Sequence, residues 1–305
     1  MTTKTESSNP TIGIIGLGIM GSAMALELLK NGYPVTGFDV VPAACKRLKA
    51  AGGQALKSAA AVADASDILI IALATSDALR ATVDQLLTAQ PKAAGQTMVV
   101  IETSTLPIED KNHVFKALKR VGMTVLDCPI SGTAVRMKER AWTVFASGSK
   151  PAFQRVEAIL RVFTDNVPFV GAFGNGTKMK FAANHLVAIY NVAYAESVNL
   201  ARKMGLDPQA VLDLFGNSPV IGTGVMRLRM PFMIQRSYSP PTMKVEVWQK
   251  DMQVIGDMAK SVHCPTPLFN ASAAIYTAAM AQGLAQEDTA STSEVLAGMA
   301  GINPG

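Results

Sequence analysis

Two lysines and an asparagine follow closely spaced glycines in GNGTKMKFAAN, residues 174–184. If this stretch is helical, Lys180 and Asn184 are one turn apart and share a face, whereas Lys178 lies roughly 200° around the axis from Lys180. The positive end of the helix dipole, burial and a nearby second cation would all lower the pKa of Lys180. Such a lysine can take a proton from a substrate hydroxyl and return it. Lys180 is therefore the candidate acid–base group, and a solvated first-turn lysine is the alternative.

A glycine-rich hexapeptide near the start of the chain has the spacing of a dinucleotide-binding turn. GLGIMG follows an apolar run and precedes a helical pattern. In GxGxxG the first glycine makes the tight turn, the second lets the backbone approach a pyrophosphate, and the third allows close packing. The predicted cofactor contacts from this turn are Gly16, Leu17, Gly18, Ile19, Met20 and Gly21. A plain glycine turn is the alternative.

An acidic residue ends the next apolar run. Asp39 follows the glycine loop by about 20 residues, where a carboxylate accepts the ribose hydroxyls and repels a 2′-phosphate. This position favours NAD as the cofactor. Lys46 and Arg47 follow closely, so NADP stays possible.

Hydroxyl side chains follow two further apolar runs, in LATSD (73–77) and ETSTLP (102–107). Ligands of open parallel sheets sit beyond the carboxyl ends of the strands. The predicted cofactor contacts there are Leu73, Thr75 and Thr105, and the Ser104 hydroxyl is a further candidate. Helix capping is an equally good interpretation of these hydroxyls.

The elements that would position these residues alternate in the first half of the chain. Short, continuously apolar runs are separated by helical patterns, which predicts a parallel sheet covered on both faces. The expected strands are 11–18, 35–40, 67–73, 97–104, 123–130, 142–148 and 167–171.

The second half reads as helical throughout. A run from about Lys178 to Met204 contains no proline or glycine, and helical patterns follow at 207–218, 245–262 and 266–283 and at the end of the chain. Glycines and prolines in 216–233 predict a pocket-lining loop, with core packing as an equal account of its apolar residues. We predict a domain of residues 1–171, whose first ten form a flexible tail, and an all-α domain of residues 172–305 for substrate binding and dimerisation.

Composition excludes several classes of protein. The chain of 305 residues is 49% hydrophobic and 17% charged, with a net charge of +5 spread along it, which disfavours disorder and nucleic-acid binding. Three distant cysteines and three histidines without ligand spacing predict no disulfide framework and no metal site. No apolar run is long enough to span a membrane, and no signal peptide is visible, so we expect a cytoplasmic protein.

Five motifs occur in order: GLGIMG, ETSTLP, DCPISGT (127–133), GNGTKMKFAAN and QKDM (249–252). Together they resemble the β-hydroxyacid dehydrogenase family over nearly the whole chain. The resemblance implies an α/β Rossmann-type N-terminal domain, an all-α C-terminal domain, a long helix joining them, and a homodimer or homotetramer.

The resemblance also assigns roles to residues. It implies that Lys180 is the catalytic lysine of the GxGxxxK motif, with Asn184 acting beside it on the substrate. Ser131, Gly132 and Thr133 correspond to the substrate loop. Lys250 corresponds to a lysine near both cofactor and substrate, Asp251 is more structural than catalytic, and Thr105 is a cofactor contact.

The substrate loop departs from the family pattern. Thr133 replaces a second glycine, Arg140 stands where glycine is usual, and Trp142 stands where an aliphatic residue is usual. Arg136, Lys138 and Arg140 could clamp a second anionic group, although a solvated basic face explains them better.

These observations predict an NAD-dependent oxidoreductase of a small 3-hydroxy acid, or a reductase of the matching semialdehyde. Two alternatives are an imine reductase-like enzyme and a dinucleotide-binding protein without turnover. Members of both groups generally lack the lysine, so Lys180 argues against them.

Overall fold

The computed structural model describes residues 9–90, 97–137 and 139–302, and it divides the chain into two compact units, Met1–Lys180 and Phe181–Gly305. The division falls inside one long helix. The predicted domain boundary at residue 171 stays a prediction. Most of the predicted tail and Lys138 lie outside the described residues.

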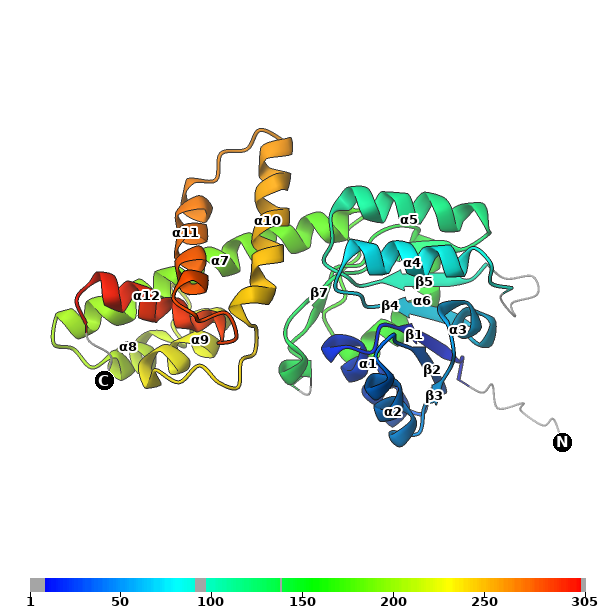
Figure 1. Cartoon of the computed structure of the whole chain (residues 1–305), viewed down its shortest axis with the longest axis horizontal. Coiled ribbons are helices and arrows are strands. Elements are labelled where there is room, and N and C mark those ends of the chain that lie inside the picture. Colours follow the sequence, from blue (N-terminus) through cyan, green and yellow to red (C-terminus); the bar gives the residue numbers. More distant parts are fainter. Residues whose placement is uncertain (1–8, 91–96, 138, 303–305) are drawn as a thin grey trace. The chain divides into compact units, whose positions relative to one another are not determined.

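The N-terminal unit contains a six-stranded parallel sheet in the order β3-β2-β1-β4-β5-β6 (Figure 1). The order reverses beside β1, so the carboxyl ends of β1 and β4 flank the switch point where such sheets bind ligands. The strands are β1 (Ile12–Ile15), β2 (Val35–Phe38), β3 (Gln54–Ala55), β4 (Ile68–Ile71), β5 (Val99–Glu102) and β6 (Thr124–Asp127).

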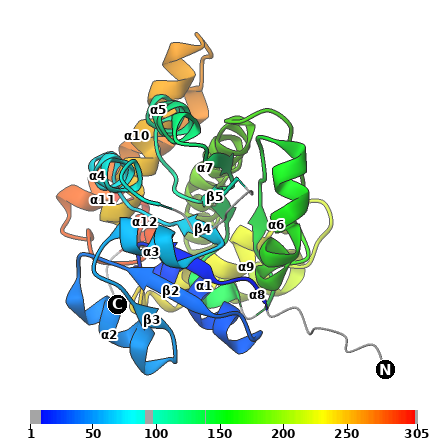
Figure 2. The same cartoon turned by 90° about the vertical axis from the view of Figure 1, so that its right-hand side faces the viewer.

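Helices cover both faces of this sheet, which is why its strands are apolar throughout (Figure 2). One buried cluster joins the sheet to α1, α2 and α6, and a second joins it to α3, α4 and α5. The helices are α1 (Ile19–Lys30), α2 (Pro42–Ala50), α3 (Ala59–Ala65), α4 (Ser76–Leu86), α5 (Ile108–Arg120) and α6 (Lys150–Phe163).

Two expected strands do not join the parallel sheet. Within the 142–148 run, the short strand β8 (Thr143–Val144) pairs antiparallel with β7 (Ile130–Ser131), and Ser147 forms a single antiparallel bridge to Asp127 at the end of β6. The 167–171 run contributes one bridge, between Ala146 and Phe169. The apolar residues of both runs fill the core cluster beside α6, so burial rather than sheet pairing explains their pattern.

The helix α7 (Asn175–Lys203) is 29 residues long and begins in the N-terminal unit. The described part of the C-terminal unit is helical, as predicted. Its further helices are α8 (Pro208–Phe215), α9 (Gly224–Gln235), α10 (Val245–Ser261), α11 (Pro267–Ala281) and α12 (Thr292–Met299).

The prediction of a loop over residues 216–233 is wrong for its second half. Helix α9 begins there, capped by the Thr223 hydroxyl, which accepts a hydrogen bond of 3.1 Å from the Met226 N–H. Pro231 lies inside this helix, where it removes one backbone hydrogen bond. Buried methionines on the same helix compensate for the lost hydrogen bond by packing in the core. The positions of glycine and proline in the sequence do not reveal this packing.

Candidate active site

The glycine loop has the geometry that a dinucleotide requires. Gly16 has φ +91°, and a Cβ there would lie 2.3 Å from the Ala72 carbonyl oxygen. A Cβ on Gly21 would lie 1.8 Å from the Gly16 carbonyl oxygen, so both positions need glycine. At Gly18, the residue before α1, a Cβ would meet nothing within 4 Å. The middle glycine therefore faces open space at a helix N-terminus, which fits a pyrophosphate.

Asp39 is tied to this loop by its own carboxylate. One oxygen accepts a hydrogen bond of 2.6 Å from the Leu17 N–H, and the other accepts one of 2.8 Å from the Val41 N–H. The side chain thus fixes the loop that carries Leu17, and each oxygen keeps a lone pair for a ribose hydroxyl. Ile19 and Met20 begin α1, with Ile19 strongly exposed.

The loops after β4 and β5 are bonded to each other. The Ser104 hydroxyl accepts the Leu73 N–H at 2.9 Å, and the Ser104 N–H donates to Glu102 at 2.9 Å. Thr75 caps α4 by accepting the Ala78 N–H at 3.2 Å, as the capping interpretation predicts. Thr105 follows in the same loop and is half-buried.

The predicted substrate loop is buttressed by an indole. The Trp142 Nε1–H donates to the Thr133 carbonyl oxygen at 2.7 Å, and Trp142 is buried. Gly132 has φ +135°, and a Cβ there would lie 2.5 Å from the Trp142 ring. The Thr133 hydroxyl is buried without a hydrogen-bond partner among the described residues, so it is a candidate ligand contact.

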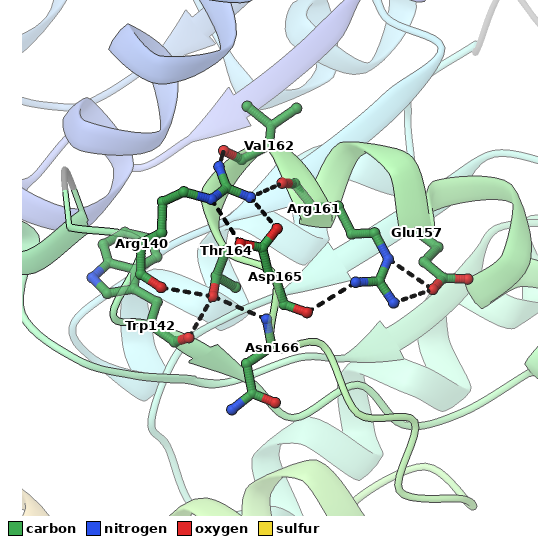
Figure 3. Close-up of polar contacts among 8 residues, drawn as sticks. All are labelled: Arg140, Trp142, Glu157, Arg161, Val162, Thr164, Asp165 and Asn166. Atoms are coloured by element: carbon green, nitrogen blue, oxygen red, sulfur yellow. Dashed lines mark hydrogen bonds and ion pairs between the residues drawn. The ribbon is translucent and has the colours of Figure 1, made fainter.

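Arg140 is exposed at the surface, where its guanidinium is bonded to neighbouring residues and does not extend as a clamp (Figure 3). Its guanidinium donates to both Asp165 carboxylate oxygens, at 3.0 and 2.7 Å, and to the carbonyl oxygens of Arg161 and Val162 at the end of α6. The hydrogen bond from Arg140 lowers the pKa of Asp165. Arg140 has φ +54°, which explains why glycine would suit this position. The side chain of Arg136, the remaining clamp candidate, lies outside the described residues, as Lys138 does.

The two lysines at the start of α7 differ in environment. Lys180 is 8% exposed, whereas Lys178 is exposed to solvent, as their angular separation predicts. Gly174 precedes the helix with φ +92°. A Cβ on Gly176 would lie 2.3 Å from the Phe145 carbonyl oxygen, so both glycines of the motif serve the tight entry of this helix.

In the C-terminal unit one carboxylate joins two predicted site residues. Asp251 accepts a hydrogen bond of 2.9 Å from the Asn184 side-chain amide and forms an ion pair of 3.3 Å with Lys250. Asn184 and Asp251 are both buried. Because an N–H of Asn184 is used by Asp251, its carbonyl oxygen is left to accept a hydrogen bond.

The N-terminal unit contains a buried charge cluster at the carboxyl ends of β5 and β6 that was not predicted from the sequence. It consists of Glu102 at the end of β5, Asp127 at the end of β6 and Lys111 on α5, and it contacts Thr177 on the first turn of α7. The available signal was an acidic residue closing each of two apolar strands. The described residues contain no His, Cys, Asp and Glu group suited to a metal ion and no helix able to cross a membrane.

The fold and the glycine loop define a dinucleotide-binding protein of the Rossmann type. Residues 11–171 match the NAD-binding domain of 6-phosphogluconate dehydrogenase, and residues 174–296 match the NAD-binding region of NADP-dependent 3-hydroxyisobutyrate dehydrogenase. The chain belongs to the β-hydroxyacid dehydrogenase family, whose enzymes act on the CH–OH group of hydroxy acids with NAD(P).

Individual relatives match nearly the whole of this chain. The chain is 29% identical over 299 residues to L-threonate dehydrogenase of Haemophilus influenzae, covering 96% of this chain and 97% of the relative. It is 29% identical to human mitochondrial 3-hydroxyisobutyrate dehydrogenase, covering 96% and 88%. The crystal structure of 3-hydroxyisobutyrate dehydrogenase from Salmonella typhimurium has a TM-score of 0.82 at 28% identity, covering 93% of this chain and 99% of that one.

Proposed function

We propose that this enzyme transfers a hydride between NAD and the hydroxyl carbon of a small 3-hydroxy acid, or reduces the matching semialdehyde, with Lys180 as the general acid and base. The observation that carries the proposal is the burial of Lys180 beside an exposed Lys178 on the first turns of α7. A buried amine can exchange a proton with a substrate, whereas an exposed one is solvated.

The residues divide the work as follows. When bound, the nicotinamide supplies the hydride chemistry. Lys180 takes the hydroxyl proton in oxidation and returns it in reduction. Asn184, fixed by Asp251, presents its carbonyl oxygen to the substrate hydroxyl. Backbone N–H groups at Ser131–Thr133 hold the substrate carboxylate.

The substrate class draws support from relatives that are named for L-threonate and 3-hydroxyisobutyrate. Both are hydroxy acids, which favours this chemistry over imine reduction or binding without turnover. A panel of these two acids, tartronate semialdehyde and succinic semialdehyde, followed by NADH absorbance, identifies the substrate. A cytoplasmic homodimer or homotetramer completes the proposal, and sedimentation of the full chain tests its assembly.

The decisive substitution is Lys180→Ala. We expect kcat to fall by at least about a hundredfold, because general acid–base catalysis contributes about that much, while NADH binding is retained. Lys178→Ala, two residues away on the same helix, is the matched control and keeps wild-type kcat. Greater damage from Lys178→Ala would refute the assignment.

A further inference from the structure

The buried charge cluster lies entirely within the N-terminal unit and connects elements that the proposed function uses. The Lys111 ammonium is 2.7 Å from a Glu102 carboxylate oxygen and 2.8 Å from an Asp127 oxygen. Glu102 and Asp127 are register partners on neighbouring parallel strands, so their carboxylates emerge side by side. All three side chains are at most 1% exposed.

Two carboxylates and one ammonium leave one net negative charge in the cluster. This charge meets the start of α7: Asp127 accepts the Thr177 N–H at 2.7 Å and the Thr177 hydroxyl at 2.7 Å. Anionic groups are favourable at a helix N-terminus, where N–H groups lack partners. The Ser147 hydroxyl adds a second attachment by accepting the Gly176 N–H at 3.0 Å. Asp127 thus caps α7 from a distant strand.

The other end of the cluster holds the cofactor loops. Glu102 accepts the Ser104 N–H at 2.9 Å, and the Ser104 hydroxyl accepts the Leu73 N–H at 2.9 Å. An unbroken chain of hydrogen bonds and ion pairs therefore runs from the loop after β4 to Thr177. Lys180 lies three residues beyond Thr177 on the same helix.

Stability alone does not account for such a cluster. Withdrawing three charges from water carries a large desolvation cost, and apolar side chains of similar size often serve stability equally well. Burial lowers the pKa of the Lys111 ammonium, but attraction to the carboxylates of Glu102 and Asp127 outweighs this effect and raises the pKa. The ammonium therefore stays charged. What a charged cluster offers is directional bonding that fixes the helix start relative to the strand ends.

We propose that Glu102, Lys111 and Asp127 position Lys180 by locking the first turn of α7, through Thr177, to the loops that follow β4 and β5. The proposal rests on the role of Lys180 given above. The three cluster members and Thr177 are positioning residues, because they act through the helix that carries the lysine.

The test replaces one hydroxyl without changing shape. Thr177→Val removes the hydrogen bond from the Thr177 hydroxyl to Asp127 but keeps the one from the backbone N–H. We expect kcat to fall about 10- to 100-fold, because a displacement of Lys180 on the order of 1 Å costs that much. NADH affinity stays at the wild-type value, and Thr177→Ser, which restores the hydroxyl, recovers most of kcat. Thr36→Val is the control: its buried hydroxyl lies 2.8 Å from that of Ser66, away from the cluster.

Hydrogen–deuterium exchange at residues 177–180 provides a readout without turnover. We expect Thr177→Val to accelerate exchange there about tenfold, as the loss of one hydrogen bond to a charged group allows, and Thr36→Val to leave it unchanged. Unchanged exchange in Thr177→Val would show that the cluster does not hold the helix, and the proposal would fall.

The outcomes separate this proposal from the function on which it rests. Wild-type turnover by Lys180→Ala refutes the role of Lys180 itself. Loss of turnover in Lys180→Ala with wild-type kcat in Thr177→Val refutes only the positioning role. A parallel fall of kcat and NADH affinity in Thr177→Val, or an equal fall in Thr36→Val, would reduce the cluster to general structural support.

Discussion

At the scale of single residues, Asp39 has more contacts than its predicted role needs. Its two carboxylate oxygens bind the N–H groups of Leu17 and Val41, so the residue that would select the ribose also fixes the glycine loop. The predicted cofactor preference and the order of the glycine loop therefore depend on the same side chain.

Asp39→Ala tests this double role. We expect weaker binding of NAD, because the loop loses two hydrogen bonds of about 1 kcal/mol each or more, and a shift of preference toward NADP, because the charge opposing a 2′-phosphate is gone. Fluorescence titration with NADH and NADPH measures both effects. The control is Asp67→Ala, which removes a 2.7 Å bond to the Thr11 N–H at the opposite end of β1. A wild-type enzyme that prefers NADP would contradict the interpretation of Asp39.

At the scale of elements, the antiparallel pair of β7 and β8 shapes the predicted substrate loop, residues 131–133. The pair brings Trp142, just before β8, against Gly132, just after β7. The indole then takes the Thr133 carbonyl as its hydrogen-bond acceptor. An aromatic residue at position 142 thus orients the peptide groups of the loop.

Trp142→Phe separates this orientation from simple packing. The phenyl ring cannot donate to Thr133, so we expect KM for the hydroxy acid to rise about fivefold, corresponding to one lost hydrogen bond of about 1 kcal/mol. NADH affinity stays unchanged. Phe153→Leu is the control, because it also loses packing in the core cluster that contains Trp142 but removes no hydrogen bond to the loop. If both variants raise KM equally, the indole hydrogen bond has no part in substrate binding.

At the scale of the whole molecule, each unit has its own buried ionic anchor. The N-terminal unit has the Glu102, Lys111 and Asp127 cluster. In the C-terminal unit, Arg229 is bonded to the buried Asp288, and Arg236 and Tyr238 bind Glu294 of α12. Arg236 is the left-handed cap of α9, so Glu294 ties the end of that helix to the last helix of the chain.

Acid should weaken the C-terminal unit through Glu294. Burial raises the pKa of this carboxyl, but hydrogen bonds from Arg236 and Tyr238 outweigh burial and hold it below the ordinary value. A depressed carboxyl pKa stabilises the fold above the unfolded pKa of about 4.3, and the contribution disappears as pH falls through the folded pKa.

Glu294→Gln measures that contribution. We expect a loss of about 1–2 kcal/mol at pH 7 and a gap from wild type that narrows steadily below about pH 4.5. Urea unfolding at several pH values provides the comparison. Glu246→Gln, which removes an exposed ion pair of 3.8 Å, should cost little at any pH. A gap that is constant from pH 7 to 3 would rule out the ionised carboxylate as its source.

Local sequence patterns predicted much of the fold and part of the candidate site of this protein. Continuous apolar runs predicted the strands β1, β2, β4, β5 and β6, and the glycine spacing predicted the dinucleotide loop. Helical phase distinguished buried Lys180 from exposed Lys178. The roles of these residues stay predictions. Each inference depends on neighbours within a few residues, so the sequence by itself carries the information.

Only the tertiary structure decided what distant residues do to one another. In the tertiary structure, the runs 142–148 and 167–171 lie outside the parallel sheet, and helix α9 continues through Pro231. Arg140 forms an ion pair with Asp165. The tertiary structure also brings Glu102, Lys111 and Asp127 together from two strands and a helix. Contacts between residues far apart in the chain depend on sheet register and helix packing, and no local pattern contains either.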